Sequence, residues 1–197
     1  FVYGGYPLLV LIAARIRPRK EPPEAPRELP SVSLIIAVHN EAGLLEAKLE
    51  NSFALDYPTD RLEMIVAADG PSPAVLGVLT RWAPRGVRAS VQARRTGKTA
   101  AQNAAALRAR GDLLVFSDVA AEYAPDAVRE LVKPFTDPAV GCTTGTITYR
   151  GQPGKTETAI YRGSQLRLRS ELAIRRSQSR AGVLFGAERL DQVRNGL

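Results

Sequence analysis

The chain has 197 residues, of which 45% are hydrophobic and 24% charged, and this balance excludes a disordered polymer and is typical of a globular domain with its own core. Lysine and arginine together number 27 against 20 acidic residues, so the formal net charge is +7. That basic excess favours an anionic partner, which could be a nucleic acid, an acidic lipid or a phosphorylated substrate. Cys142 is the only cysteine, which excludes a disulfide within the chain and fits a reducing compartment.

An apolar segment opens the chain. Residues 1–14 carry no charged side chain, and Arg15 and Arg17 follow at once. A helix over that stretch would be about 21 Å long, short of the roughly 30 Å hydrocarbon core of a bilayer. Basic residues directly after an apolar segment mark the cytoplasmic side of a membrane. We therefore expect residues 1–16 to form a partial transmembrane or interfacial helix, and a helix buried within the fold is the alternative.

A proline-rich stretch comes next. Residues 17–30 combine prolines with charged side chains, which predicts an extended linker without packing. Beyond it, apolar runs of strand length alternate with helical patterns. Strands are expected at 32–38, 62–68, 87–92, 112–117 and 140–149, and helices at 41–55, 72–82, 99–110 and 125–135. This alternation is typical of an α/β domain with a mainly parallel sheet, which we place at residues 31–150.

The last part of the chain, residues 151–197, has a different character. Residues 156–180 predict a long helix with arginines along its length. A basic amphipathic helix can lie on a membrane surface. A solvated helix at the edge of the domain explains the same pattern, so both interpretations stay open.

Polar residues follow the predicted strands, at the edge where parallel sheets bind ligands. Asp118 ends a buried strand, and a carboxylate there suits Mg²⁺ or Mn²⁺, which in turn bind a diphosphate. Taken alone, Asp118 could cap a turn, and Asp69 with Gly70 could form an ordinary turn. Lys98 could contact a phosphate or be one more solvated lysine. The placement of these residues after successive strands is what indicates a binding site.

Two familiar nucleotide motifs are disfavoured. Residues 39–43, which follow the first strand, lack the G-x-G-x-x-G pattern of a dinucleotide site. The run Gly97-Lys98-Thr99 resembles the end of a P-loop. A P-loop also has glycine five residues before Gly97, and this chain has Gln92 there. The segment therefore lacks a glycine loop that could wrap phosphates.

Five segments together carry a resemblance to a known family: 32–41, 67–70, 94–103, 114–118 and 123–128. In their order and spacing over residues 31–150, the chain resembles the N-terminal part of bacterial processive-type family 2 glycosyltransferases. Residues 3–9 also resemble the end of that family's N-terminal membrane helix. The resemblance implies a GT-A type nucleotide-sugar-binding domain with a mainly parallel central sheet, preceded by part of a membrane helix.

The resemblance also implies roles for individual residues. The loop from Ala37 through His39 to Glu41 would lie against the nucleotide. Asp69 would hydrogen-bond the uracil ring, and Lys98 would lie near the diphosphate. Asp118 would be the first residue of the metal-binding D-x-D motif, with Mg²⁺ or Mn²⁺ as the cofactor. The nucleotide-sugar-binding residues expected from the sequence are therefore Ala37, His39, Glu41, Asp69, Lys98 and Asp118, with Asp118 as the metal ligand.

The implied activity is inverting transfer of a hexosyl or N-acetylhexosaminyl group. The donor would be a UDP-sugar and the acceptor a glycan or lipid-linked molecule, in polysaccharide or glycoconjugate synthesis. The implied location is the inner membrane, with the catalytic domain in the cytoplasm. A nucleic-acid partner is not expected, because no aromatic-rich RNA-binding motif accompanies the arginines.

The chain departs from the family pattern in two ways. Ala120 stands at the third position of the metal motif, where the family has Asp or Asn, so metal affinity should be weak. No Asp in a catalytic-base context and no Q-x-x-R-W follow, so we assign no catalytic residue. We expect residues 151–197 to lead toward a missing acceptor-binding half, in a truncated chain that is inactive alone. Two alternatives are a degenerate nucleotide-sugar-binding module without catalysis and a basic membrane- or nucleic-acid-binding protein.

Overall fold

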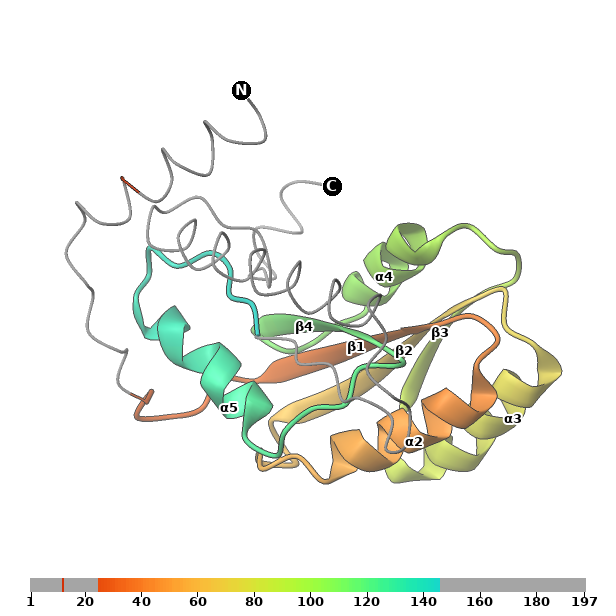
Figure 1. Ribbon diagram of the computed structural model, residues 1–197, viewed down its shortest axis with the longest axis horizontal. Helices are drawn as coiled ribbons and strands as arrows, with labels where there is room; N and C mark the ends of the chain where they lie inside the picture. The colour runs from red at the N-terminus through yellow and green to blue at the C-terminus, as the bar shows by residue number, and fades with distance from the viewer. Residues whose placement is uncertain (1–11, 13–24, 146–197) are drawn as a thin grey trace, which may run out of the picture. The chain divides into compact units, whose positions relative to one another are not determined.

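In the part of the chain that the structure describes, a parallel sheet has four strands in the order β3-β2-β1-β4 (Figure 1). This computed structural model describes Ile12 and residues 25–145. The strands are β1 (Val32–Val38), β2 (Leu62–Asp69), β3 (Arg88–Gln92) and β4 (Leu113–Asp118). All three neighbouring pairs are parallel, so the predicted α/β fold with a mainly parallel sheet is confirmed.

Helices connect the strands, as the sequence predicts. They are α2 (Ala42–Phe53), α3 (Pro73–Trp82), α4 (Lys98–Ala106) and α5 (Ala127–Val132), with 3₁₀ turns η1 (Ala83–Arg85) and η2 (Lys133–Thr136). The Ser72 side chain accepts a hydrogen bond from the Val75 amide and so caps α3, whose first residue is proline. The predicted helices at 99–110 and 125–135 run longer than α4 and α5, because the last residues of each form turns or a 3₁₀ helix.

Helices cover both faces of the sheet, and β1 is buried along its whole length. On one face Leu34 and Ile36 pack in a cluster with side chains of α2, α3 and α5. On the other face Ile35 packs with the small side chains of α4, among them Ala101 and Ala105. Figure 1 shows α4 on one side of the sheet and α2, α3 and α5 on the other. Because side chains alternate along a strand, a continuous apolar run is needed to fill both cores.

The strand expected at 140–149 is wrong for the part that the structure describes. Residues 140–145 form neither helix nor strand. Alternation of apolar and polar residues is a local signal, whereas a strand also needs a partner with which to form its hydrogen bonds. Gly141 and Gly145 weaken the strand preference further. Residues 146–149 lie outside the described part.

The end of the predicted linker is packed, contrary to the expectation. The Tyr57 hydroxyl donates to the Pro30 carbonyl over 2.6 Å, and the Arg61 guanidinium donates to the Leu29 carbonyl and pairs with Glu28. Leu29 also packs against the larger core cluster. These contacts tie the chain to the amino edge of the sheet before β1 begins, so the packed domain starts slightly earlier than residue 31.

Several expectations concern residues that the structure does not describe. The expected membrane or interfacial helix at 1–16 is one, apart from Ile12, and the basic helix at 156–180 within 151–197 is another. Among Ile12 and residues 25–145, no helix has the length and apolar character needed to cross a bilayer.

A half-buried carboxylate, Glu63, organises the amino edge of the sheet. It accepts hydrogen bonds from the Ser33 hydroxyl and the Arg110 amide, and it pairs with Arg88 over 2.6 Å. Burial pushes the pKa of Glu63 upward, but these hydrogen bonds and the Arg88 charge outweigh it and hold the pKa below its usual value. The side chain therefore links β1, β2, β3 and the turn before β4.

We predict that Glu63→Ala lowers the free energy of unfolding by about 1–3 kcal/mol at pH 7, because it removes the acceptor of the buried Ser33 hydroxyl and the partner of Arg88. The Glu63 pKa is lower in the folded than in the unfolded chain, so its contribution is complete above the unfolded value and is lost as the pH falls through the folded value. Urea unfolding of the chain between pH 7 and pH 3 measures this. The exposed Glu50→Ala is the control, and a difference between Glu63→Ala and the unaltered chain that stays constant down to pH 3 would contradict the prediction.

Candidate functional site

The predicted site residues gather at the carboxyl edge of the sheet. Asp118 is the last residue of β4 and lies in register with Ala37 of β1. On the other side of β1, Val38 pairs with Ala68, and Asp69 follows as the last residue of β2. The central strand therefore separates two carboxylates that end its two neighbours. The sequence placed them at one edge correctly, because all these strands are parallel.

Asp69 is buried, with 6% of its surface exposed, and holds the loop that precedes α4. One carboxylate oxygen accepts from the Thr96 amide at 2.6 Å and from the Thr96 hydroxyl at 3.1 Å. The other accepts from the Gly97 amide at 2.9 Å. These bonds, led by that from the Thr96 amide, hold the pKa of Asp69 below its usual value, so the group is a carboxylate at neutral pH.

Two glycines shape this loop, and Gly70 lets it approach the end of β2 closely. Gly70 has φ +60°, and a Cβ built there would lie 2.8 Å from the Arg95 amide nitrogen. Gly97 has φ +97° and stands directly before the first residue of α4. Both conformations are costly for residues with a side chain. Asp69 and Gly70 thus do more than form a turn. Asp69 bonds the loop at residues 96 and 97, and Gly70 leaves room for its backbone at residues 94 and 95.

His39 ties the ends of β1 and β2 together. Its Nδ1 is hydrogen-bonded to the Asp69 carbonyl, and its Nε2 lies 3.0 Å from the Asn40 side-chain nitrogen. The Asn40 oxygen accepts from the Ser72 amide at 3.1 Å, at the start of α3. A carbonyl can only accept, so Nδ1 donates to it, and Nε2 accepts from the Asn40 side-chain amide group. Both ring nitrogens are therefore engaged within the protein.

Glu41 turns its carboxylate back on the same loop. One oxygen accepts from the Asn40 amide at 3.0 Å and from the His39 amide at 3.2 Å. Bonds from its own amide and from these two hold the pKa of Glu41 below its usual value. The carboxylate thus stabilises the connection between β1 and α2.

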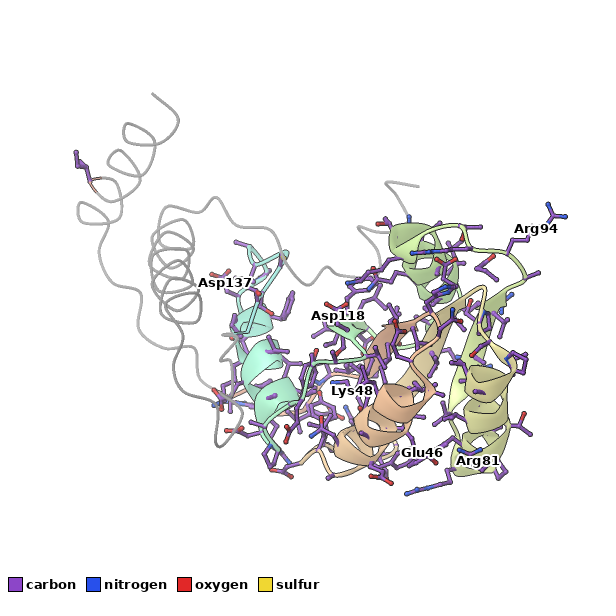
Figure 2. The ribbon with its side chains drawn as sticks, turned by 45° about the vertical axis from the view of Figure 1, so that its right-hand side comes forward. Glu46, Lys48, Arg81, Arg94, Asp118 and Asp137 are labelled. Atoms are coloured by element: carbon purple, nitrogen blue, oxygen red, sulfur yellow. The ribbon has the colours of Figure 1, made fainter. Side chains whose placement is uncertain are left out.

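Lys98 and Asp118 form an ion pair across the site. Lys98 begins α4 and Asp118 ends β4, and their side chains are 55% and 62% exposed. Exposed ion pairs of this kind contribute roughly 0–1 kcal/mol. The pair is therefore easily exchanged for contacts with a ligand. Arg94, on the loop before α4, extends away from the domain in Figure 2.

The residues present suit a divalent metal only as part of a larger ligand set. Asp118 offers one exposed carboxylate, and the exposed Ala120 offers no ligand. Within residues 25–145 and Ile12, no group of three or more His, Cys, Asp and Glu side chains is close enough to hold a metal. Mg²⁺ is commonly held by one or two protein carboxylates together with substrate phosphates and water. The donor set therefore fits a metal that arrives with a phosphorylated ligand.

Two residues of α2 contact the segment after Asp118, and the sequence reasoning did not assign them to the site. Lys48 is buried and donates to the Ala121 carbonyl at 2.6 Å. Asn51 makes two hydrogen bonds with the Tyr123 backbone. The available signal was a lysine within the apolar stripe of a helix, between Leu45 and Leu49.

Comparison with known proteins points to one enzyme class. The chain is 30% identical over 151 residues to an N-acetylglucosaminyltransferase of Rhizobium sp. (strain N33), covering 75% of this chain and 33% of that protein. It is 28% identical over 152 residues to the beta-monoglucosyldiacylglycerol synthase of Synechocystis sp. (strain ATCC 27184 / PCC 6803 / Kazusa), covering 70% of this chain and 31% of the relative. The chain thus spans about a third of the length of these relatives.

Solved structures share the fold. The mannosyltransferase PcManGT from Pyrobaculum calidifontis, in complex with GDP-Man and Mn²⁺, matches with a TM-score of 0.63 and 31% identity, over 72% of this chain and 44% of that one. S. aureus TarS 1-349 in complex with UDP matches with a TM-score of 0.52 and 18% identity, over 62% of this chain and 38% of that one. The second likeness concerns the fold alone.

A family model covers most of the chain, including the sheet, the loop held by Asp69 and the segment after Asp118. It matches residues 33–190 and describes Glycosyl transferase family 2. The parallel sheet, with Asp69 and Asp118 at its carboxyl edge, is the part of a GT-A fold that the described residues contain. The chain belongs to glycosyl transferase family 2.

Proposed function

We propose that the chain binds a nucleoside diphosphate sugar at the carboxyl edge of its sheet, as the donor of glycosyl transfer. The observation that carries the proposal is the convergence of Asp69, Lys98 and Asp118 at one edge of a family 2 domain. Ligands of parallel α/β sheets bind at this edge. The three side chains also come from three different elements, so only the folded chain presents them together.

The nucleotide base would lie against the loop from Ala37 to Glu41, with Asp69 as its polar partner. A carboxylate has about four lone-pair sites, and Thr96 and Gly97 use three at Asp69. One acceptor site is left for a ring N–H, which uracil and guanine both possess. We propose uracil as the base. The relative solved with GDP-Man makes guanine the alternative to be tested.

The diphosphate would lie beside Lys98. This lysine is the first residue of α4, where the helix dipole favours an anion. Its ion pair with Asp118 is exposed and weak, so a diphosphate can take over the ammonium group. Asp118 is then free to serve as a carboxylate ligand of Mg²⁺ or Mn²⁺. Such a metal, when bound, supplies positive charge that stabilises the diphosphate as a leaving group.

The acceptor and the membrane complete the proposal. We propose transfer of a hexosyl or N-acetylhexosaminyl group to a glycan or lipid-linked acceptor at the inner membrane, with the domain in the cytoplasm, to build a polysaccharide or glycoconjugate. The diacylglycerol named for one relative supports a lipid acceptor. We assign no catalytic base within residues 25–145, because Asp69 and Asp118 already have binding roles. A binding module without catalysis is the second candidate, favoured by Ala120.

We predict that the chain binds UDP at least about tenfold more tightly than GDP, a difference of about 1.4 kcal/mol. Asp69→Asn should weaken UDP binding by about tenfold. The NH₂ group of Asn is itself a donor and cannot accept the hydrogen bonds that the 96–97 loop and the base donate to the carboxylate. Calorimetry with both nucleotides and Mn²⁺ measures this. Asp60→Asn is the control, since Asp60 is an exposed acid at the other edge. Tighter binding of GDP would replace uracil by guanine, and binding of neither would refute the donor site.

Mn²⁺ should raise the affinity for UDP by some factor, and we predict that this factor is about tenfold larger in Ala120→Asp. The substitution adds a second carboxylate near Asp118. Ala120 is exposed, so the substitution buries no charge. Titration of UDP with and without Mn²⁺ measures the gain. Ala124→Asp is the matched control, since it adds the same charge at an exposed position of the same segment. An equal gain from both variants would indicate a nonspecific charge effect and count against a metal site at Asp118.

A further inference from the structure

Residues 121, 123 and 125, in the segment that follows Asp118, form backbone hydrogen bonds with α2 and with Asp56, which lies just after α2. The carbonyl of Ala121 accepts from Lys48 at 2.6 Å. The amide and the carbonyl of Tyr123 each bond Asn51 at 2.9 Å. The Pro125 carbonyl accepts from the Asp56 amide at 2.8 Å. We call residues 121–125 the strap. Its backbone bonds side chains of α2 that lie 73 and 72 residues away in the sequence.

Lys48 is an unusual residue for this place. It is 3% exposed and lies in the apolar stripe of α2. Its ammonium group sits 3.6 Å from the centre of the Tyr123 ring, so one charge serves both a hydrogen bond and a cation–π contact. Burial lowers the pKa of Lys48 to about 8, and the carboxylates of Asp118 and Glu122 oppose this change. The ammonium form therefore predominates at neutral pH.

Asn51 adds a second and independent hold, one helical turn further along α2. Its side-chain nitrogen donates to the Tyr123 carbonyl and its oxygen accepts from the Tyr123 amide. An amide side chain thus pairs with the strap as a neighbouring strand would. Figure 2 shows Lys48 reaching from α2 toward the segment that leaves β4 at Asp118.

The strap is joined to Asp118 by a single tight turn. The Ala121 amide donates to the Asp118 carbonyl at 3.0 Å, so only Val119 and Ala120 lie between the carboxylate residue and the residue that Lys48 holds. On its other side, Asp118 is fixed by the pairing of β4 with β1. The carboxylate itself is 62% exposed and has no second motif carboxylate beside it at Ala120.

We propose that Lys48 and Asn51 are positioning residues for Asp118, which hold the strap and thereby set where the Asp118 carboxylate meets the metal and diphosphate of the donor. The proposal rests on the proposed function of Asp118. A site with one motif carboxylate depends on the placement of that carboxylate alone, because no second ligand corrects it. A buried lysine is also a costly way to pack an apolar stripe, so its charge has a use beyond packing.

Hydrogen exchange of residues 119–126 tests the hold on the strap. Lys48→Met should speed exchange of the Ala121 amide by about tenfold, and Asn51→Ala should do the same for Tyr123, because local opening then costs less. Lys48→Arg, which keeps the charge and donors, should restore most of the protection.

Arg81→Met is the control. It removes the ion pair between Arg81 of α3 and Glu46 of α2, which are 2.9 Å apart and do not touch the strap. Asn51 is only half-buried, so that variant keeps the test available if Lys48→Met does not fold. Unchanged exchange, or a uniform rise over the whole domain, would overturn the proposal.

Nucleotide titration tests the consequence at the site. In Lys48→Met and Asn51→Ala, the gain in UDP affinity from Mn²⁺ should fall by about tenfold, while affinity without metal stays within about twofold, since ligand orientation affects metal binding first. Lys48→Arg should recover the gain. An equal loss with and without Mn²⁺ would mean that these residues only stabilise the domain, and it would overturn the positioning role. If the unaltered chain binds no nucleotide, the proposed function fails, and the exchange result still decides whether α2 holds the strap.

Discussion

The burial of β1 on both faces is the constraint on which the rest of the domain depends. All seven residues of this strand are buried, and it pairs with β2 on one side and β4 on the other. Such a strand can carry apolar or small side chains along its length, because helices cover it above and below. The charged residues of the four strands, Glu63, Asp69, Arg88 and Asp118, lie at the two edges of the sheet, where the chain enters and leaves the core.

The two edges use carboxylates in different ways. At the amino edge, Glu63 has its oxygens occupied by Ser33, Arg88 and the backbone around residue 110, so it binds the parts of the domain together. At the carboxyl edge, Asp118 is exposed and forms a weak, exposed ion pair with Lys98. Asp69 is intermediate, since it is buried and holds the 96–97 loop through three hydrogen bonds. The degree to which a carboxylate is already hydrogen-bonded thus separates Glu63, which has a structural role, from Asp69 and Asp118, which we propose as ligand-binding positions.

Helix α2 connects the core to the carboxyl edge of the sheet. Its apolar residues Leu45 and Leu49 fill the core beneath β1, while Lys48 and Asn51 on the same helix bond the segment after β4. A helix that packs against the sheet has a fixed position. Hydrogen bonds from its polar side chains therefore restrict the motion of residues 121–123, which have no regular structure of their own. Preorganised binding sites are generally supported in this way, by groups behind those that touch the ligand.

The sequence by itself determined the order of strands and helices, the parallel sheet and the edge at which Asp69, Lys98 and Asp118 lie. Apolar runs such as Val32–Val38 report burial on both faces, and in a parallel sheet the residue after each strand has only one edge to occupy. The tertiary structure alone decided what each polar group bonds to. Asp69 holds Thr96 and Gly97, which lie 27 and 28 residues away, and Lys48 holds Ala121, 73 residues away. It also decided that residues 140–145 form no strand, despite their alternation. Local patterns report periodicity and burial, whereas a hydrogen-bond partner is chosen by the three-dimensional approach of distant segments.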